Sequence, residues 1–326
     1  MQQLSVAVIL PTYDEEGFVD ECLASLAVQD YRGPWEVVVA DGGSTDATVD
    51  RIGAWADRLR LRILHNPARV QSEGLWTAAT ATEADVLVRA DAHTTYAPDY
   101  VRRSVEILLE SGATAVGGPM APEAPSRFGR AVSRMMRSRL GVGPGAFHHG
   151  GDRRTVDTVY LGAFRRSDFL ELGGMRTLPA GVAEDADFYW RLRRAGGTVL
   201  LDPSIRSTYR PRESWSGLAR QFFRYGRGKA DMLLVNRAWP SWRPFAPLAL
   251  VLGLLLGLLL GPFVGWWPLV ALLAAWMLAL LVAARGRLLD LLVAATMHLA
   301  YGWGLLGGLF RSPARVRAQV VSRSVP

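Results

Sequence analysis

Acidic side chains stand shortly after three of the short apolar runs in the N-terminal half of the sequence. They are Asp14-Glu15-Glu16, Asp41 and Asp91, and His93 lies two residues beyond the last of them. Any one of these carboxylates would indicate no more than a helix cap or a polar turn. Several at one edge of a sheet repel one another unless positive charge lies among them. A divalent cation with oxygen ligands, bound together with a nucleotide, would supply that charge.

The apolar runs are the expected strands of a mostly parallel sheet. We expect strands at Val6–Leu10, Trp35–Ala40, Leu61–Leu64 and Val86–Ala90, and helices at Glu15–Gln29, Asp46–Leu59, Gln71–Ala81 and Pro98–Glu110. Alternation of strands and helices at this spacing is typical of βαβ units in an α/β fold. Ligands bind beyond the carboxyl ends of the strands in such sheets, and all three acidic stretches follow strand ends.

Further motifs follow in a fixed order. They are Asp157-Thr158-Val159 before Gly162-Ala163-Phe164-Arg165-Arg166, then Gly173-Gly174-Met175, Glu184-Asp185-Ala186-Asp187, and Gln221-Phe222-Phe223-Arg224-Tyr225-Gly226. Together with P-T-Y-D-E-E, D-G-G-S-T-D and D-A-H after the strands, they make residues 4–235 resemble family 2 glycosyltransferases of the GT-A fold. The D-A-H and Q-x-x-R-Y-G details are closest to the branch that includes succinoglycan-type exopolysaccharide glucosyltransferases.

This resemblance implies a Rossmann-like GT-A nucleotide-sugar transferase domain followed by C-terminal membrane helices. It also implies an inverting displacement, in which an acceptor hydroxyl attacks the anomeric carbon of a nucleotide diphosphate sugar without a protein nucleophile. A UDP-sugar is the expected donor, and a glycan or lipid-linked molecule of cell-surface polysaccharide synthesis is the expected acceptor. The motifs do not name the sugar.

The resemblance also assigns roles to individual residues. Asp185 matches the general base that takes the proton of the acceptor hydroxyl, and Glu184 would contact that hydroxyl. Asp91 and His93 would hold Mn²⁺ or Mg²⁺ on the donor diphosphate, and the imidazole suits Mn²⁺ better. The donor would be bound by Pro11, Tyr13, Glu15, Asp41, Gln221, Arg224 and Tyr225, with Asp41 on the uracil or its ribose and Arg224 near the diphosphate.

Structural alternatives stand beside these roles. Asp185 opens a helix, where the positive end of the helix dipole stabilises a carboxylate. Asp187 could instead only cap that helix or pair with Arg191 one turn later. Met175-Arg176 replaces the Phe-Asp that usually follows the two glycines, which removes an acid near the acceptor site. His148-His149 could form a metal pair, but the glycine-rich stretch around it is more simply a loop that closes over the donor.

The C-terminal part of the sequence is strongly apolar. Residues 244–284 carry no formal charge and would form roughly 60 Å of helix, enough for two crossings of a ~30 Å hydrocarbon core. With Gly261-Pro262 as the break, we expect spans at residues 245–261 and 265–284. A third apolar segment, residues 288–310, is either spanning or interfacial, and the basic tail beyond it favours the interfacial placement. The predicted domains are a catalytic domain at residues 1–238 and a membrane region at residues 239–326, and a chain that ends near Asn236 should be soluble.

Charge and cysteine content narrow the function further. Most of the net charge of +7 lies after residue 245, where six arginines accompany one acid, Asp290. General attraction to nucleic acid is therefore not expected. The single cysteine, Cys22, excludes an internal disulfide and a cysteine metal cluster. Residues 6–10 are too short for a signal peptide. We expect a multi-pass protein of the inner (plasma) membrane whose catalytic domain lies in the cytoplasm.

Other functions fit the motifs less well. A nucleotidyltransferase would need a basic, glycine-rich phosphate loop where P-T-Y-D-E-E stands. A dehydrogenase would need a glycine-rich turn directly after the first strand, whereas the glycines at residues 141–145 come too late. A processive synthase would need more spans to enclose a channel. The alternative we retain is a catalytically inactive glycosyltransferase-like scaffold subunit of a polysaccharide assembly complex, and the intact Asp41, Asp91 and Asp185 argue against it.

Overall fold

The computed structural model describes residues 3–143, 145–238, 242 and 244–320, and it is built on an eight-stranded sheet in the order β3-β2-β1-β4-β9-β6-β10-β8. Parallel pairing joins β1 (Val6–Thr12), β2 (Trp35–Asp41), β3 (Leu61–His65) and β4 (Val86–Arg89). Antiparallel to its neighbours, β9 (Tyr160–Arg165) separates β4 from β6 (Ala115–Gly118). The sheet ends with β10 (Val199–Leu201) and β8 (Arg154–Thr155). The expected α/β fold and its four strands are confirmed.

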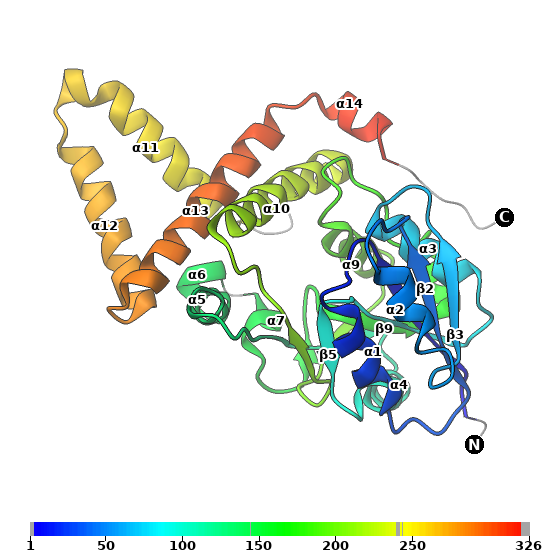
Figure 1. Cartoon of the computed structure of the whole chain (residues 1–326). Helices are drawn as coiled ribbons and strands as arrows, with labels where there is room; N and C mark the ends of the chain where they lie inside the picture. The colour runs from blue at the N-terminus through cyan, green and yellow to red at the C-terminus, as the bar shows by residue number, and fades with distance from the viewer. Residues whose placement is uncertain (1–2, 144, 239–241, 243, 321–326) are drawn as a thin grey trace.

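Helices cover both faces of this sheet (Figure 1) because the strands are apolar on both sides. In β1, Val6, Val8 and Leu10 face α1 (Val19–Ala27) and α4 (Tyr100–Ser111), whereas the alternate residues Ala7 and Ile9 face the other layer. That second layer contains α3 (Gln71–Thr80), α8 (Arg166–Glu171) and α9 (Glu184–Arg194). Burial on both faces is expected of parallel strands that are connected by helices.

Two of the expected helices are shorter than predicted, because the acidic loops after β1 and β2 hydrogen-bond to each other. The backbone N–H of Glu15 donates to Thr48 Oγ1 at 2.7 Å, and that of Glu16 donates to Asp46 Oδ2 at 3.2 Å. The predicted helix at Glu15–Gln29 was therefore wrong in its first turn, since α1 begins at Val19. The predicted helix at Asp46–Leu59 is reduced to α2 (Thr48–Gly53) followed by turns.

A second sheet of three short strands lies beyond the carboxyl end of β4. Its order is β5-β11-β7, formed by β5 (Thr94–Tyr96), β11 (Ser207–Tyr209) and β7 (Met120–Pro122). Three helices follow β7 in the chain, namely α5 (Arg127–Met136), α6 (Arg139–Val142) and α7 (Ala146–His149). After β11 the chain enters α10 (Trp215–Asn236), which carries the last sequence motif. The small sheet thus joins the β4 end to α10.

Three C-terminal helices are long and apolar enough to cross a membrane: α11 (Phe245–Val264), α12 (Trp267–Ala284) and α13 (Leu288–Leu309). Figure 1 shows α11 and α12 as a hairpin that projects away from the sheet. The predicted break at Gly261-Pro262 was wrong. Pro262 lies within the last turn of α11, and the chain reverses after Val264 at Gly265, whose positive φ of 85° suits glycine. The short α14 (Pro313–Ala318) ends the described chain.

Helix α13 packs along α10, which belongs to the catalytic half of the chain. Glycines allow the two backbones to touch: a Cβ on Gly226 would lie 2.2 Å from the carbonyl oxygen of Tyr301, and one on Gly304 would lie 2.0 Å from that of Phe223. An ion pair of 2.8 Å between Asp231 of α10 and Arg311 holds the end of the contact. Asp290 of α13, which is buried, likewise accepts a bidentate contact from Arg134 of α5.

Candidate active site

Asp91 lies where β4 ends, beneath the loop that contains His93. Its carboxylate is almost fully buried, and Oδ1 accepts hydrogen bonds from Gln71 Nε2 at 3.0 Å and from Arg89 Nε at 3.4 Å. The Tyr96 hydroxyl accepts the backbone N–H of Asp91 at 2.8 Å and so fixes the turn. Within the described chain, Oδ2 takes part in no hydrogen bond, so it is available to a ligand.

Arg89 is a buried arginine that joins two acidic groups of the site. Its Nη2 lies 3.5 Å from Asp91 Oδ1 and 3.7 Å from Glu184 Oε1. Burial acts to lower the pKa of Arg89, but the carboxylates of Asp91, Glu184 and Asp185 more than offset it and raise that pKa. Sequence reasoning missed this residue. The available signal was a positive charge within the otherwise apolar run V-L-V-R-A before Asp91.

The first turn of α9 lies next to Arg89 and Asp91, and these residues together form the first, acidic corner of the site. Glu184 is buried, and burial together with the neighbouring Asp185 raises the pKa of its carboxyl above the ordinary range. Asp185 is half-buried, and the hydrogen bond recorded for its carboxylate comes from the backbone N–H of Ala186 at 2.7 Å. Of the three acids in this turn, Asp185 is the most exposed, whereas Glu184 and Asp187 are buried.

Asp187 has a structural role. It is fully buried and pairs with Arg191 at 2.9 Å and with Arg176, while Asn236 of α10 donates to it at 2.7 Å. Hydrogen bonds and ion pairs to these partners lower its pKa, against the opposing effect of burial. The expected pairing with Arg191 is therefore confirmed. Arg176, which stands where relatives usually have an acid, is one of the groups that compensate the Asp187 charge.

The ends of β1 and β2 form a second corner. Thr12 and Asp41 are paired neighbours, and Asp41 is buried. Its Oδ2 accepts the backbone N–H of Gly43 at 2.8 Å and that of Ser44 at 2.9 Å, so the carboxylate shapes the D-G-G-S turn itself. Tyr13 is 43% exposed beside this turn, with the guanidinium of Arg69 5.9 Å from its ring centre. Arg69 was not anticipated from sequence.

The motif on α10 reaches the first corner through the small sheet. Gln221 Nε2 lies 3.0 Å from both the Tyr209 and the Tyr225 hydroxyl oxygens. The Tyr209 ring makes an edge contact with His93 at a centroid distance of 5.4 Å. Arg224 instead donates to the carbonyl of Gly181 at 3.4 Å, in the loop before α9. The structure therefore joins Gln221 and Tyr225 to the His93 corner, and Arg224 to the α9 loop.

His93 and Glu15 meet, with Nδ1 and Oε1 3.5 Å apart. Glu15 was expected to bind the donor and His93 to bind the metal, and the structure brings these two side chains into contact. Pro11 lies elsewhere, on β1 against α3. Among the residues described, no group of three or more histidine, cysteine or acidic side chains could hold a metal ion by itself. One carboxylate and one imidazole suit Mn²⁺ better than Mg²⁺ when donor oxygens complete the ligand set. His148 and His149 lie on α7.

The fold is that of a GT-A glycosyltransferase, and comparison with known proteins agrees. The model of glycosyl transferase family 2 matches residues 7–173, and the chain belongs to that family. The succinoglycan biosynthesis protein ExoA of Rhizobium meliloti is 33% identical over 250 residues, which cover 76% of this chain and 75% of that protein. A dolichyl N-acetyl-alpha-D-glucosaminyl phosphate 3-beta-D-2,3-diacetamido-2,3-dideoxy-beta-D-glucuronosyltransferase of Methanococcus voltae is 23% identical over 70% of this chain and 74% of its own.

Two solved structures support the fold. The mannosyltransferase PcManGT of Pyrobaculum calidifontis, in complex with GDP-Man and Mn²⁺, aligns with a TM-score of 0.62 at 22% identity, over 90% of this chain and 86% of that one. S. aureus TarS 1-349, in complex with UDP-GlcNAc, aligns with a TM-score of 0.52 at 16% identity, over 94% and 93% of the two chains. The GT-A assignment is therefore confirmed, and the protein is a glycosyltransferase of exopolysaccharide or glycan biosynthesis.

Proposed function

We propose that the protein is a membrane-attached inverting glycosyltransferase that moves a sugar from a nucleotide diphosphate sugar to a glycan or lipid-linked acceptor in cell-surface polysaccharide synthesis. UDP-sugars are the first donors to test. The observation that carries the proposal is the convergence of Asp91 and Glu184-Asp185 on the buried Arg89. This arrangement gathers a ligand for the donor diphosphate and a base for the acceptor at one edge of the sheet.

Each side of the reaction then has its own residues. Asp185 accepts the proton of the acceptor hydroxyl as the oxygen attacks the anomeric carbon, and Glu184 orients that hydroxyl. Asp91 and His93 would hold a divalent cation, Mn²⁺ or Mg²⁺, which would offset the charge that develops on the leaving diphosphate. Attack opposite the leaving group inverts the anomeric centre.

The second corner binds the nucleotide. Tyr13 offers an exposed ring for stacking against the base, and Arg69 stands over the same ring. Asp41 accepts a hydrogen bond from the base or ribose, and Pro11 on β1 and Glu15 in the loop after β1 complete the donor set. Gln221 and Tyr225 support the His93 side through Tyr209. The nucleotide sugars and Mn²⁺ in the two solved neighbours support this donor class.

The test of this function is release of a nucleoside diphosphate from a panel of nucleotide sugars by the purified full-length protein in detergent with Mn²⁺. We expect hydrolysis of one sugar nucleotide well above the others, because a site that aligns donor and base also admits water slowly. If no donor is consumed with Mn²⁺ or Mg²⁺, while the protein remains folded by its melting curve, the inactive scaffold is the correct alternative.

For the membrane we propose a single hairpin of α11 and α12, with α13 at the interface and the catalytic domain in the cytoplasm. The packing of α13 against α10 supports the interfacial placement of α13. α10 carries Arg220, Arg224, Arg227 and Lys229, and a helix with these charges cannot accompany α13 across a hydrocarbon core. Residues 239–326 then form the membrane region. Within it, α13 lies at the interface and packs on the catalytic domain of residues 1–238. The boundary itself falls on residues 239–241, outside the described residues.

Single-cysteine labelling tests this topology. Cys22 is the one native cysteine and is fully buried, so the wild-type protein should not react with a maleimide. In spheroplasts, a membrane-impermeant maleimide should label Phe263→Cys at the hairpin tip but not Arg315→Cys on α14, until the membrane is permeabilised. Asp57→Cys on the catalytic domain is the matched control for the inside. Equal labelling of Arg315→Cys and Phe263→Cys in intact spheroplasts would show that α13 crosses.

A further inference from the structure

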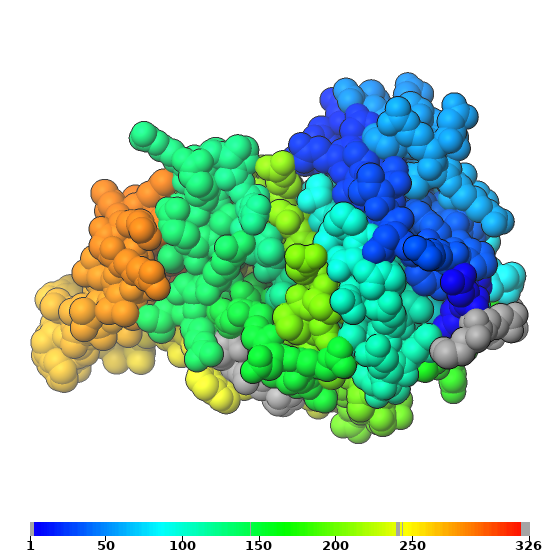
Figure 2. Space-filling model, turned by 90° about the horizontal axis from the view of Figure 1, so that it is seen from below, coloured from blue at the N-terminus to red at the C-terminus, as the bar shows by residue number. Residues whose placement is uncertain are grey.

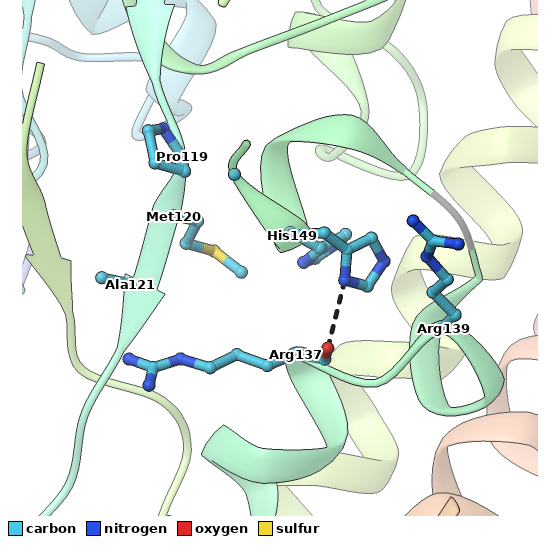
Figure 3. Close-up of a pocket in the computed structure, with 8 residues that line it drawn as sticks. Pro119, Met120, Ala121, Arg137, Arg139 and His149 are labelled. Carbon is cyan, nitrogen blue, oxygen red and sulfur yellow. Dashed lines mark hydrogen bonds between the residues drawn. The ribbon is translucent and has the colours of Figure 1, made fainter. Parts of the chain in front are cut away.

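A hollow of about 370 Å³ lies beside β7 of the small sheet. Its walls include Met120 of β7, Arg137 and Arg139 at the ends of the α5–α6 turn, and His148 and His149 of α7. Figure 3 shows Arg137 extending beneath Met120 and Ala121, and Arg139 standing beside the His149 ring. No carboxylate is among the described residues that line the hollow, so its charge is positive.

The two arginines are only weakly neutralised. Arg139 is exposed and has no hydrogen-bond or ion-pair partner within the described chain. The Arg137 guanidinium donates to the Pro122 carbonyl at 3.0 Å and lies 3.8 Å from Glu123, but both of these charged side chains are at least half exposed. Water and salt weaken such a pair, which leaves both guanidinium groups able to bind an anion.

Two histidines form another side of the hollow. Backbone carbonyls of Arg137 and Gly143 lie 3.1 and 2.9 Å from the two ring nitrogens of His149, so this ring is fixed in place. His148 has a buried Nδ1 with no partner among the described residues. Burial, with a contribution from His149, lowers the pKa of His148 to about 3, so the ring is neutral at physiological pH and its free nitrogen can hydrogen-bond to a ligand.

The outer wall of the hollow touches the apolar helices. Trp276 of α12 donates to His298 Nδ1 at 3.2 Å, so Nε2 of that ring carries the proton and donates to the Leu140 carbonyl of α6 at 2.8 Å. Figure 2 shows the green segment that contains α5 to α7 directly beside the orange of α12 and the start of α13. A lipid chain lying along these helices would therefore end at the arginines.

The inner wall leads toward the acidic corner. β7 pairs with β11, and Met120 packs in the same apolar cluster as Tyr209 of β11. Tyr209 in turn contacts His93. Met120 and Tyr209 lie on the same face of the three-stranded sheet and thus connect the hollow to the expected reaction site. A ligand that is anchored in the hollow is next to the site without occupying it.

We propose that this hollow binds the phosphate or diphosphate group of a lipid-linked acceptor, with Arg137 and Arg139 pairing with its oxygens and His148 completing the contact. This inference rests on the proposed function and names its acceptor class. Guanidinium groups pair well with phosphate oxygens because their donors match that geometry. A flat phospholipid surface would need positive charge but no recess, whereas here the cations stand at the rim of a hollow with a buried, unsatisfied ring nitrogen.

The experiment measures binding of farnesyl diphosphate to the full-length protein in neutral detergent by isothermal titration calorimetry. Excess chelator is present, so that a diphosphate cannot bind at Asp91 and His93 through a metal. Arg137→Gln/Arg139→Gln should weaken binding at least tenfold. Arg127→Gln/Arg130→Gln removes the same charge from exposed positions on α5 outside the hollow and should change binding less than twofold. Equal affinity of the first variant and the wild type would overturn the proposal, as would equal weakening in both variants.

Two further arms separate the possible sources of the phosphate. Phosphatidylglycerol added to the micelles at the concentration of farnesyl diphosphate should not displace it. If it does, the site serves bulk lipid head groups and the proposal is wrong. Hydrolysis of the donor sugar should be unchanged in Arg137→Gln/Arg139→Gln, which also shows that the variant is folded. If the wild type and Arg137→Gln/Arg139→Gln bind farnesyl diphosphate equally while donor hydrolysis is intact, only the binding site in the hollow is refuted. If the two proteins differ in binding but the wild type hydrolyses no donor, only the proposed function is refuted.

Discussion

Asp91→Ala is expected to reduce sugar transfer by on the order of 10³-fold or more, because this carboxylate is the strongest expected ligand for the cation at the leaving diphosphate. Its free Oδ2 faces no competing donor among the described residues, whereas Oδ1 is held by Gln71 and Arg89. Steady-state kinetics with the preferred nucleotide sugar measure the effect. Excess chelator should inactivate the wild-type protein to a similar degree, and Mn²⁺ should restore it.

Gln71→Ala is the matched control for Asp91. It removes a 3.0 Å hydrogen bond to the same carboxylate but leaves the ligand in place, so the loss should be about 10–100-fold, as for other groups that orient a metal ligand. Melting curves must accompany both variants because Asp91 also compensates the buried Arg89. Full wild-type activity in excess chelator would refute the metal site whatever the variants do.

Asp185→Asn is expected to lower the catalytic rate by on the order of 10²–10⁴ with little change in donor affinity, which is the usual contribution of a general base. The decisive comparison is with Glu184→Gln and Asp187→Asn at saturating donor. Glu184→Gln should have a smaller effect on the rate, because the raised pKa of Glu184 makes it the poorer source of a free carboxylate at the same pH.

Asp187→Asn should instead act on stability. It removes the charge that compensates Arg176 and Arg191, and breaking one partner of a buried pair costs about 3–5 kcal/mol. The folded fraction of this variant should retain its rate. If Asp185→Asn keeps near wild-type turnover while Glu184→Gln fails, the base is Glu184 and the motif has been aligned one residue off.

The acidic edge of the sheet could be predicted from sequence for a physical reason. Parallel strands put their carboxyl ends on one side, so Asp41 and Asp91 had to lie at the same edge of the sheet once the β-branched runs were recognised. The pairing of Asp187 with Arg191 was similarly local, since side chains four residues apart on a helix are neighbours. Both inferences needed only spacing along the chain.

Other features depend on contacts between distant segments and have no local pattern. Arg89 meets Glu184 through the packing of α9 against the sheet, and the small sheet pairs three-residue strands from three separate parts of the chain. Pro262 was misread because a proline was expected to end the helix before it. Within the last turn of α11 the helix continues past it for two residues before Gly265 reverses the chain.

The contact between α10 and α13 has a consequence for how the protein can be divided. A chain that stops near Asn236 loses α13, and the face of α10 that holds Gly226, Ala230 and Leu233 is then uncovered. Asp231, now without Arg311, would be left on that apolar face. Such a truncation should be prone to aggregation rather than soluble, and an anchor borrowed from another protein would not replace the missing helix. We expect the minimal soluble enzyme to be the catalytic domain with α13 rejoined to it by a short linker in place of the hairpin.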